Sequence, residues 1–239
     1  MITSEDMARY SRQILMPEIG LDGQQRLKNA KVFIVGVGGL GSAAAIYLAS
    51  SGVGVLGLAD MDRVERNNLH RQVLFSDRDI GKEKTDAARN NLRALNPNVK
   101  INIHENVIEN ANAIKDYDIV VDCTDNFQAR YVINDACIAT RKPNVYGSVV
   151  QFTGQLTVFS PNGPCYRCLF PTQPEGVKTC SEVGILSPLA GMIGTMQAIE
   201  TIKLIIGKGQ SLSGRLFTFD ALTNEMRYLK LPKRKGCVC

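Results

Sequence analysis

Apolar and polar positions alternate along the chain in a way that predicts strands and helices in turn. Runs at residues 31–35, 55–59, 100–105 and 119–122 have the length and apolar content of strands. Between them, residues 42–50 and 82–95 have the composition and spacing of helices. Two short helices are expected earlier, at residues 6–15 and 23–29. The pattern predicts an α/β fold with a Rossmann-like, mostly parallel sheet.

The pattern changes after Pro143. Strand signals at residues 145–150, 155–159, 215–219 and 226–231 are closely spaced, which favours antiparallel strands that extend the sheet. A Cys-rich loop and a long helix at residues 189–206 interrupt them. No linker rich in Pro, Gly or Ser separates these parts. We therefore expect one domain over residues 1–239, with N-terminal helices (1–30), a nucleotide-binding part (31–142) and a final part (143–239).

Composition and charge narrow the classes of function. The chain has 44% hydrophobic and 21% charged residues and a net charge of +5 spread along its length, so we expect no nucleic-acid partner. Residues 1–12 lack the apolar run of a signal peptide. The apolar stretch 185–206 contains Pro188, Gln197, Glu200 and Lys203, which a bilayer would tolerate poorly. We expect a cytoplasmic protein without a membrane span.

A glycine-rich turn follows the first strand and opens a helix. Its sequence places glycines at 36, 38, 39 and 41, and Asp60 follows the second strand. Glycines allow the backbone to approach a phosphate, a helix N-terminus favours negative charge, and an acid at this place can bind ribose hydroxyls. Gly36, Gly38, Gly39, Gly41 and Asp60 are therefore candidate nucleotide-binding residues.

Further polar residues follow the ends of the next predicted strands, at the edge where parallel sheets bind ligands. Cations and acids gathered there suit a triphosphate with Mg²⁺ better than a nicotinamide, because Arg and Lys bind phosphate and a carboxylate can ligate Mg²⁺. A charged, solvated surface is the alternative interpretation. The candidates are Asp62, Asn68, Arg71, Gln72, Lys84 and Asp125.

Two pairs of cysteines have metal-ligand spacing. Cys165 and Cys168 are separated by two residues, and Cys237 and Cys239 by one. Four thiolates from two loops would make a closed tetrahedral Zn²⁺ site that ties the end of the chain to the Cys-rich loop. Free thiols and three-cysteine coordination remain open alternatives.

In these residues the chain resembles the ThiF/MoeB/HesA adenylyltransferases, relatives of the ubiquitin-activating enzymes, over nearly its whole length. The resemblance rests on ordered motifs: Arg9-Tyr10-Ser11-Arg12-Gln13-Ile14, the glycine turn, Asn68-Leu69-His70-Arg71-Gln72, Gly81-Lys82-Glu83-Lys84, Asp122-Cys123-Thr124-Asp125-Asn126, Cys165-Tyr166-Arg167-Cys168 and residues 180–188. Two departures are His70, where the family usually has Gln, and the shorter terminal Cys-x-Cys.

The resemblance implies an enzyme that uses ATP to adenylylate the C-terminal Gly carboxylate of a small ubiquitin-like sulfur carrier ending in Gly-Gly. The carrier would be ThiS-like or MoaD-like, and pyrophosphate release would prepare it for thiocarboxylate formation in thiamine or molybdopterin biosynthesis. The resemblance also implies a homodimer in which Arg12 reaches the neighbouring subunit's ATP. In it, Asp60 would hold ribose, Asn68, Arg71 and Lys84 the phosphates, and Asp125 the Mg²⁺.

Cys180 aligns with a cysteine that some members of the family use for covalent chemistry with the activated carrier. A loop thiol without a catalytic role is an equally open interpretation. Since no rhodanese-like extension follows Cys239, we expect a separate sulfur donor, such as a cysteine desulfurase or a rhodanese.

Two other classes of function stay open. An NAD-dependent oxidoreductase would use the same glycine turn and Asp60, but it leaves Arg71, Lys84, Asp125 and the cysteine pairs unexplained. A scaffold that binds a ubiquitin-like partner without turnover is the third class.

Overall fold

The computed structural model describes residues 1–104, 111–174, 176, 183–237 and 239. In this part of the chain, eight strands form one sheet in the order β3-β2-β1-β4-β5-β6-β7-β8. The strands are β1 (Lys31–Val35), β2 (Val55–Ala59), β3 (Lys100–His104), β4 (Ile119–Asp122), β5 (Asn144–Val150), β6 (Thr153–Phe159), β7 (Arg215–Asp220) and β8 (Glu225–Lys230).

The first five strands are parallel, and their register brings the ends of three strands level. Val35 of β1 pairs with Ala59 of β2 and with Asp122 of β4. The residues that follow these strands therefore meet at one edge of the sheet, which is where parallel sheets bind ligands. β6, β7 and β8 continue the sheet in antiparallel pairing. The predicted α/β fold with a mixed sheet is confirmed.

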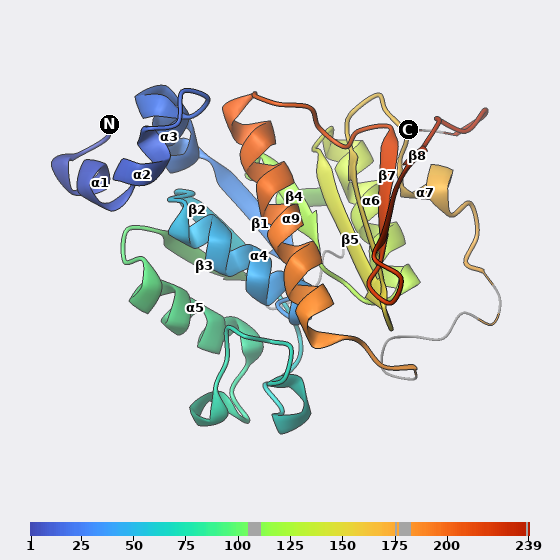
Figure 1. The fold of residues 1–239 in the computed structure, drawn as a ribbon, viewed down its shortest axis with the longest axis horizontal. Helices are drawn as coiled ribbons and strands as arrows, with labels where there is room; N and C mark the ends of the chain where they lie inside the picture. Colours follow the sequence, from blue (N-terminus) through green and yellow to red (C-terminus); the bar gives the residue numbers. More distant parts are fainter. Residues whose placement is uncertain (105–110, 175, 177–182, 238) are drawn as a thin grey trace.

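Helices cover both faces of the sheet, as Figure 1 shows. The helices are α1 (Ser4–Arg9), α2 (Ser11–Ile14), α3 (Gly20–Asn29), α4 (Gly39–Ser50), α5 (Lys84–Leu95), α6 (Phe127–Thr140), α7 (Tyr166–Leu169) and α9 (Ser187–Ile206), with short 3₁₀ turns η1 (Arg66–Asn68), η2 (Asp77–Asp79) and η3 (Ala111–Ile114).

Alternate residues of β1 separate two hydrophobic clusters. Val32 and Ile34 belong to the larger cluster, which also contains side chains of α4, α5 and α9. Phe33 and Val35 point to the opposite face and pack with residues of η3 and α6. A strand buried on both faces reads as a continuous apolar run, which explains why β1 was easy to predict.

Helix α9 crosses the sheet beside α4 and packs against β5 and β6. Its length and composition would suffice to span a membrane, but half of its most apolar stretch is buried within the fold. A close crossing holds it there, because a Cβ at Gly194 would lie only 2.2 Å from the carbonyl oxygen of Leu40 in α4. The burial agrees with the prediction of a core helix.

Several predicted boundaries were wrong, and two helices, α6 and α7, were missed. Helix α4 begins at Gly39 rather than residue 42, and α5 at Lys84 rather than 82. The N-terminal segment 6–15 is two short helices, α1 and α2, whose boundary is Tyr10. The shorter missed helix, α7, is one turn within the predicted Cys-rich loop. The longer one, α6, begins after Asn126, whose side chain accepts a hydrogen bond from the Ala129 N–H at 2.9 Å.

Candidate active site

The glycine turn has no room for side chains at two positions. Gly36 adopts a φ of +85°, and a Cβ there would lie 2.9 Å from the carbonyl oxygen of Cys123. A Cβ at Gly41 would lie 1.9 Å from the carbonyl oxygen of Gly36. Gly38 caps α4 without a side-chain hydrogen bond. The N-terminus of α4 therefore opens onto the level edge of the sheet, a place suited to bind an anion.

Asp60, Asp62 and Lys84 form a group of charges beside this turn. The Asp60 carboxylate accepts hydrogen bonds from the backbone N–H groups of Val37, at 2.7 Å, and Asp62, at 2.9 Å. Lys84, 4% exposed, places its Nζ 2.6 Å from Asp62 Oδ2 and 3.8 Å from Asp60 Oδ1. Burial raises the pKa of Asp60, and the nearby Lys84 ammonium opposes that shift. The structure thus places a buried ammonium at the start of α5, in reach of an anion.

Asn68, Arg71 and Gln72 come from the connection between β2 and α5. Asn68 and Gln72 are buried, and Gln72 has a side-chain oxygen without a hydrogen-bond partner. Arg71 donates to the carbonyl oxygen of Asn67 at 3.0 Å, and its side-chain methylenes would be 3.5 Å from a Cβ at Gly39. The side-chain nitrogen of Gln72 would be 3.6 Å from a Cβ at Gly38, so Arg71 and Gln72 lie over the glycine turn.

Asp125 follows β4 and is exposed. Its carboxylate contacts the amide nitrogen of Asn126 at 3.4 Å, and no ion pair with a described residue involves it. Its oxygens are available to a ligand or a metal ion, as a carboxylate in a Mg²⁺ site must be.

These residues line one cavity of about 420 Å³ at the edge of the sheet. It brings together the following sequence-predicted residues: Gly36, Gly38, Gly39, Asp60, Asp62, Asn68, Arg71, Gln72, Lys84 and Asp125. Gly41 lies behind the turn and does not line the cavity. The volume lies within the range of small-molecule sites.

Arg130 is a site residue that the sequence analysis missed. It lies on α6, is 6% exposed, and donates to the Thr124 carbonyl oxygen at 2.7 Å and to Ser148 Oγ at 3.2 Å. Its guanidinium lies 5.2 Å from the centre of the Tyr146 ring. The sequence signal for Arg130 is a lone Arg on the apolar side of the helix 127–140. This signal can be recognised only after that helix has been predicted.

A second cavity, of about 430 Å³, adjoins the first and shares Asp125, Asn126, Arg130 and Ser148 with it. Its other walls come from β5, β6 and the segment that follows α7, and they include Phe127, Tyr146 and Phe170. We call it the aromatic groove. A long substrate could lie in the groove with one end at the charged cavity.

Arg12 is the one predicted nucleotide-binding side chain among the described residues that lies far from this cavity. It is exposed on α2, next to Gln13, whose amide donates to the Ser51 carbonyl oxygen at 3.1 Å. Ser51 caps the C-terminal end of α4, and the helix is 12 residues long, about 18 Å from the glycine turn. Arg12 cannot reach the cavity of its own chain. Cys180 lies outside the described residues.

The four predicted zinc ligands lie together. Their sulfur atoms are within 4.8 Å of one another, with contacts of 3.5 Å for Cys165–Cys237, 3.6 Å for Cys168–Cys239 and 3.9 Å for Cys165–Cys168. Four sulfurs at about 2.3 Å from a tetrahedral Zn²⁺ would be about 3.8 Å apart. The Arg234 N–H also donates to Cys168 Sγ at 3.3 Å. The shortened Cys-x-Cys therefore fits a four-thiolate site.

The comparison with protein families decides the relationship of this chain. The model of the ThiF family matches residues 10–239. The chain belongs to the ThiF family. Within it, the adenylyltransferase and sulfurtransferase MOCS3 of Drosophila willistoni is 48% identical over 245 residues, covering 99% of this chain and 54% of MOCS3. MOCS3 of Culex quinquefasciatus is 48% identical over 244 residues, covering 99% and 56%. The chain spans about half the length of these curated relatives.

Solved structures similar to this ThiF-family chain include the microcin C7 biosynthetic enzyme MccB in complex with N-formylated MccA. Its TM-score is 0.86 at 25% identity, over 99% of this chain and 76% of that chain. E. coli MccB with ATP has a TM-score of 0.81 at 25% identity, over 96% and 73%. The family and the fold expected from the motifs are both confirmed.

Asp79 stabilises the connection between β2 and α5, which carries Asn68, Arg71 and Gln72. It accepts hydrogen bonds from Ser76 at 3.0 Å, from Lys82 at 3.0 Å and from Asn91 of α5 at 3.2 Å. Burial opposes ionisation, but the hydrogen bonds from Lys82, Asn91 and Ser76 prevail and lower the pKa of Asp79 to about 2. The ionised carboxylate therefore stabilises the folded state.

We predict that Asp79→Asn reduces the free energy of unfolding most at neutral pH. Because the folded pKa is depressed, the wild-type advantage is complete above the unfolded pKa of about 3.9 and is lost as pH falls towards 2. Urea unfolding at several pH values between 7 and 2.5 measures it. The exposed neighbour substitution Asp77→Asn is the matched control. A difference between Asp79→Asn and wild type that does not shrink over this range would contradict the prediction.

Proposed function

We propose that this protein is an adenylyltransferase that uses ATP to activate the C-terminal carboxylate of a ubiquitin-like sulfur carrier. The observation that carries the proposal is the joining of a charged cavity, containing Lys84 and Arg71, to the aromatic groove at Asp125 and Arg130. The charged cavity suits a nucleoside triphosphate, and the aromatic groove suits a peptide tail whose C-terminal end reaches that triphosphate. The family membership and the names of the MOCS3 relatives support the same activity.

In this proposal the charged cavity holds ATP. Asp60, at the end of β2, would bind ribose hydroxyls, since each of its oxygens retains a lone pair beyond its one backbone hydrogen bond. The free N–H groups at the start of α4 and the side chains of Asn68, Arg71, Gln72 and Lys84 would bind the phosphates. Arrival of a phosphate would give Lys84 a second kind of partner besides the Asp62 carboxylate.

The aromatic groove would hold the carrier's last residues. A tail that ends in Gly-Gly has no side chains near its carboxylate, so it can lie against Phe127 and Tyr146 and enter between them and the phosphates. Arg130, at the junction of both spaces, would orient that carboxylate. The groove would therefore accept a carrier protein whose C-terminal residues lack bulky side chains.

The reaction needs no general base from the protein. A carboxylate oxygen of the carrier attacks the α-phosphorus, and the bond from that phosphorus to the oxygen bridging the β-phosphorus breaks. Pyrophosphate leaves with the electron pair, and a mixed anhydride with AMP remains. The protein's task is alignment and the neutralisation of phosphate charge by Arg71 and Lys84. Mg²⁺, which Asp125 could ligate, would supply further neutralisation.

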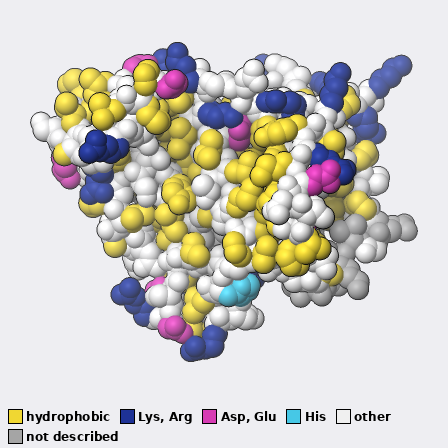
Figure 2. All heavy atoms as spheres, in the orientation of Figure 1, with side chains coloured by type: hydrophobic (Ala, Val, Ile, Leu, Met, Phe, Trp, Pro, Cys, Tyr) yellow, Lys and Arg dark blue, Asp and Glu magenta, His cyan; other side chains and the backbone are white. Residues whose placement is uncertain are grey.

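We also propose a homodimer in which each cavity takes Arg12 from the partner subunit. Two observations support it: Arg12 lies at the far end of α4 from its own cavity, and apolar side chains are exposed where α4 and α9 lie side by side. Tyr47 of α4 is 51% exposed and Ile199 of α9 is 50% exposed. Figure 2 shows hydrophobic side chains spread over this face. An apolar face of this kind is expected where a second subunit packs.

The remaining expectations extend this proposal. Residues 1–239 would act as one unit, in which 143–239 contribute the groove and the zinc site. The carrier would be ThiS-like or MoaD-like, the sulfur donor a separate protein, and the location cytoplasmic. Cys180 would act after adenylylation if it has a covalent role.

The first test concerns Asp125. We predict that Asp125→Ala lowers carrier-dependent exchange of labelled pyrophosphate into ATP at least about 100-fold, because the cavity loses its available carboxylate. Asp22→Ala removes an exposed carboxylate of α3 and serves as the control. The assay uses purified carriers that end in Gly-Gly, with NAD binding measured beside it. Wild-type exchange by Asp125→Ala would remove the assigned role, and tight NAD binding without exchange would overturn the proposed function.

The second test concerns the shared site. Arg12→Ala and Arg71→Ala should each be inactive, and mixing them should restore up to about a quarter of wild-type activity, because half of the dimers are mixed and each holds one intact site. Arg9→Ala, on the neighbouring helix, is the control and should keep its activity. No recovery, in a mixture where mass spectrometry shows subunit exchange, would count against a contribution of Arg12 across subunits.

The third test concerns the cysteine cluster. Because its sulfur contacts fit tetrahedral geometry, we predict about one zinc per chain by elemental analysis of protein purified without chelators. Cys239→Ser should lose most of the metal and lower the unfolding temperature. The buried Cys137→Ala lies outside the cluster and should keep the zinc. The zinc assignment would be refuted if the purified wild-type protein contained no metal and unfolded at the same temperature as Cys239→Ser.

A further inference from the structure

The helices that carry Arg12 make few apolar contacts with their own chain. Helix α1 buries one side chain, that of Asp6, and none of the four residues of α2 is buried. Met7, Leu15 and Met16 are exposed. Figure 1 shows α1 and α2 at an outer corner of the fold, and Figure 2 shows hydrophobic side chains gathered on this corner. The direction of Arg12 must therefore be set by other contacts.

Hydrogen bonds of Gln13 supply the first of these contacts. Its side-chain nitrogen donates to Gln24 Oε1 at 2.7 Å and to the Ser51 carbonyl oxygen at 3.1 Å. Gln24 is fully buried, and its own side-chain nitrogen donates to the same carbonyl oxygen at 3.0 Å. Because Gln24 belongs to α3 and Ser51 caps α4, Gln13 ties α2 to two larger helices.

Tyr10 supplies the second contact, on the other side of Arg12. Its hydroxyl accepts a hydrogen bond from the buried Asn96 amide at 2.8 Å, and this amide also donates to the Ala49 carbonyl oxygen of α4 at 2.7 Å. The Tyr10 ring fills the space beside Gly52, which has a φ of +84°. A Cβ at Gly52 would lie only 2.6 Å from that ring. The absence of a side chain at this position therefore makes room for Tyr10.

We call the four side chains of Tyr10, Gln13, Gln24 and Asn96 the polar latch. Hydrogen bonds fix distance and angle more narrowly than apolar contacts do. A buried amide that loses its partner is also costly, so displacement of α2 is penalised from both sides of Arg12. The polar latch therefore holds α2 in one orientation at the C-terminal end of α4.

We propose that Gln13 and Tyr10 are positioning residues for Arg12, and that they act on the cavity of the partner subunit rather than on their own. This inference rests on the proposed function and on its shared site. Arg12 lies at the end of α4 opposite to the glycine turn, so the orientation of α2 has no direct effect on the cavity of the same chain. A guanidinium held in place before the triphosphate binds loses less freedom when it meets the phosphates.

The test compares two mixtures of variants by carrier-dependent pyrophosphate exchange. Gln13→Ala should lower exchange at least about tenfold, because small displacements of a group that contacts the reacting phosphates are costly. Mixed with Arg71→Ala, it should recover to about a quarter of wild type, since half of the dimers then combine an intact cavity with a correctly held Arg12. Mixed with Arg12→Ala, it should not recover, because both changes impair the same contribution.

A role of Gln13 within its own cavity predicts the reverse pattern, with recovery in the Arg12→Ala mixture and none in the Arg71→Ala mixture. That result would overturn the proposal, and so would full activity of Gln13→Ala alone. Tyr10→Phe keeps the ring but removes the acceptor for Asn96, and it should follow the pattern of Gln13→Ala with a smaller loss.

The control is Gln25→Ala, which removes a neighbouring glutamine that bonds Asn29 within α3, and it should leave exchange unchanged. Thermal unfolding verifies that each variant is folded, and mass spectrometry verifies subunit exchange. Lack of exchange by the wild type with every carrier tested would overturn the proposed function, and this proposal with it. Wild-type exchange together with either contrary result above overturns the proposal alone.

Discussion

The close approach of the glycine turn to the end of β4 is the constraint on which the candidate site depends. Gly36 and Gly41 have no space for a Cβ, since the carbonyl oxygens of Cys123 and Gly36 occupy it. This contact brings the N-terminus of α4 against the strand end that carries Asp125. Gly194 of α9 also lacks space for a Cβ, because α9 crosses α4 close to the carbonyl oxygen of Leu40. Side chains at these glycines would move the helix, and with it the N–H groups that face the cavity.

The charges around the cavity follow from this placement. Parallel strands of equal register end together, so Asp60 and Asp122 are brought near Lys84 and Arg130, which belong to the helices that follow. Burial raises the pKa of both carboxyl groups, and the two cations oppose that shift. A buried charge left without a partner is costly, so each cation offsets part of the cost of ionising the acid beside it. The edge of the sheet is thereby kept polar and available to phosphates.

Much of this arrangement could be predicted from the sequence, for identifiable reasons. Strands β1, β2 and β4 are buried on both faces and therefore appear as uninterrupted apolar runs, so the edge of the sheet that carries the candidate site could be predicted. The four cysteines were recognisable from their spacing, although only the structure shows that Cys237 and Cys239, with one intervening residue, lie together with Cys165 and Cys168. Helix α6 was missed because its polar and aromatic residues are mixed, so its apolar residues show only a weak helical periodicity. Arg130, Asn144 and the aromatic groove depend on that helix and on long-range pairing, which no local pattern reveals.

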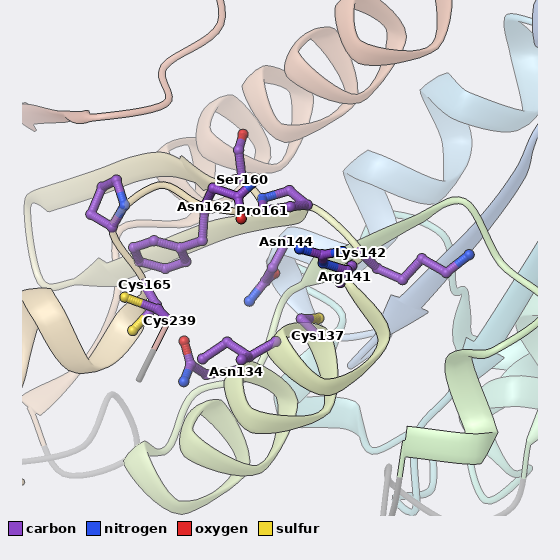
Figure 3. Close-up of a pocket in the computed structure, with 13 residues that line it drawn as sticks. Asn134, Cys137, Arg141, Lys142, Asn144, Ser160, Pro161, Asn162, Cys165 and Cys239 are labelled. Atoms are coloured by element: carbon purple, nitrogen blue, oxygen red, sulfur yellow. The ribbon is translucent and has the colours of Figure 1, made fainter. Parts of the chain in front are cut away.

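The two ends of β5 illustrate how one strand can serve two different surroundings. Towards its carboxyl end, Ser148 receives a hydrogen bond from Arg130 and faces the proposed site of chemistry. At its amino end, Asn144 sits among α6, the turn after β6 and two residues of the cysteine cluster, Cys165 and Cys239, which together line the cavity shown in Figure 3. The same helix, α6, carries Arg130 in its first half and is followed at its end by Arg141. β5 and α6 therefore both contribute to the cavity at Asn144 and to the charged cavity, and the same two elements fix where these two spaces lie in the fold.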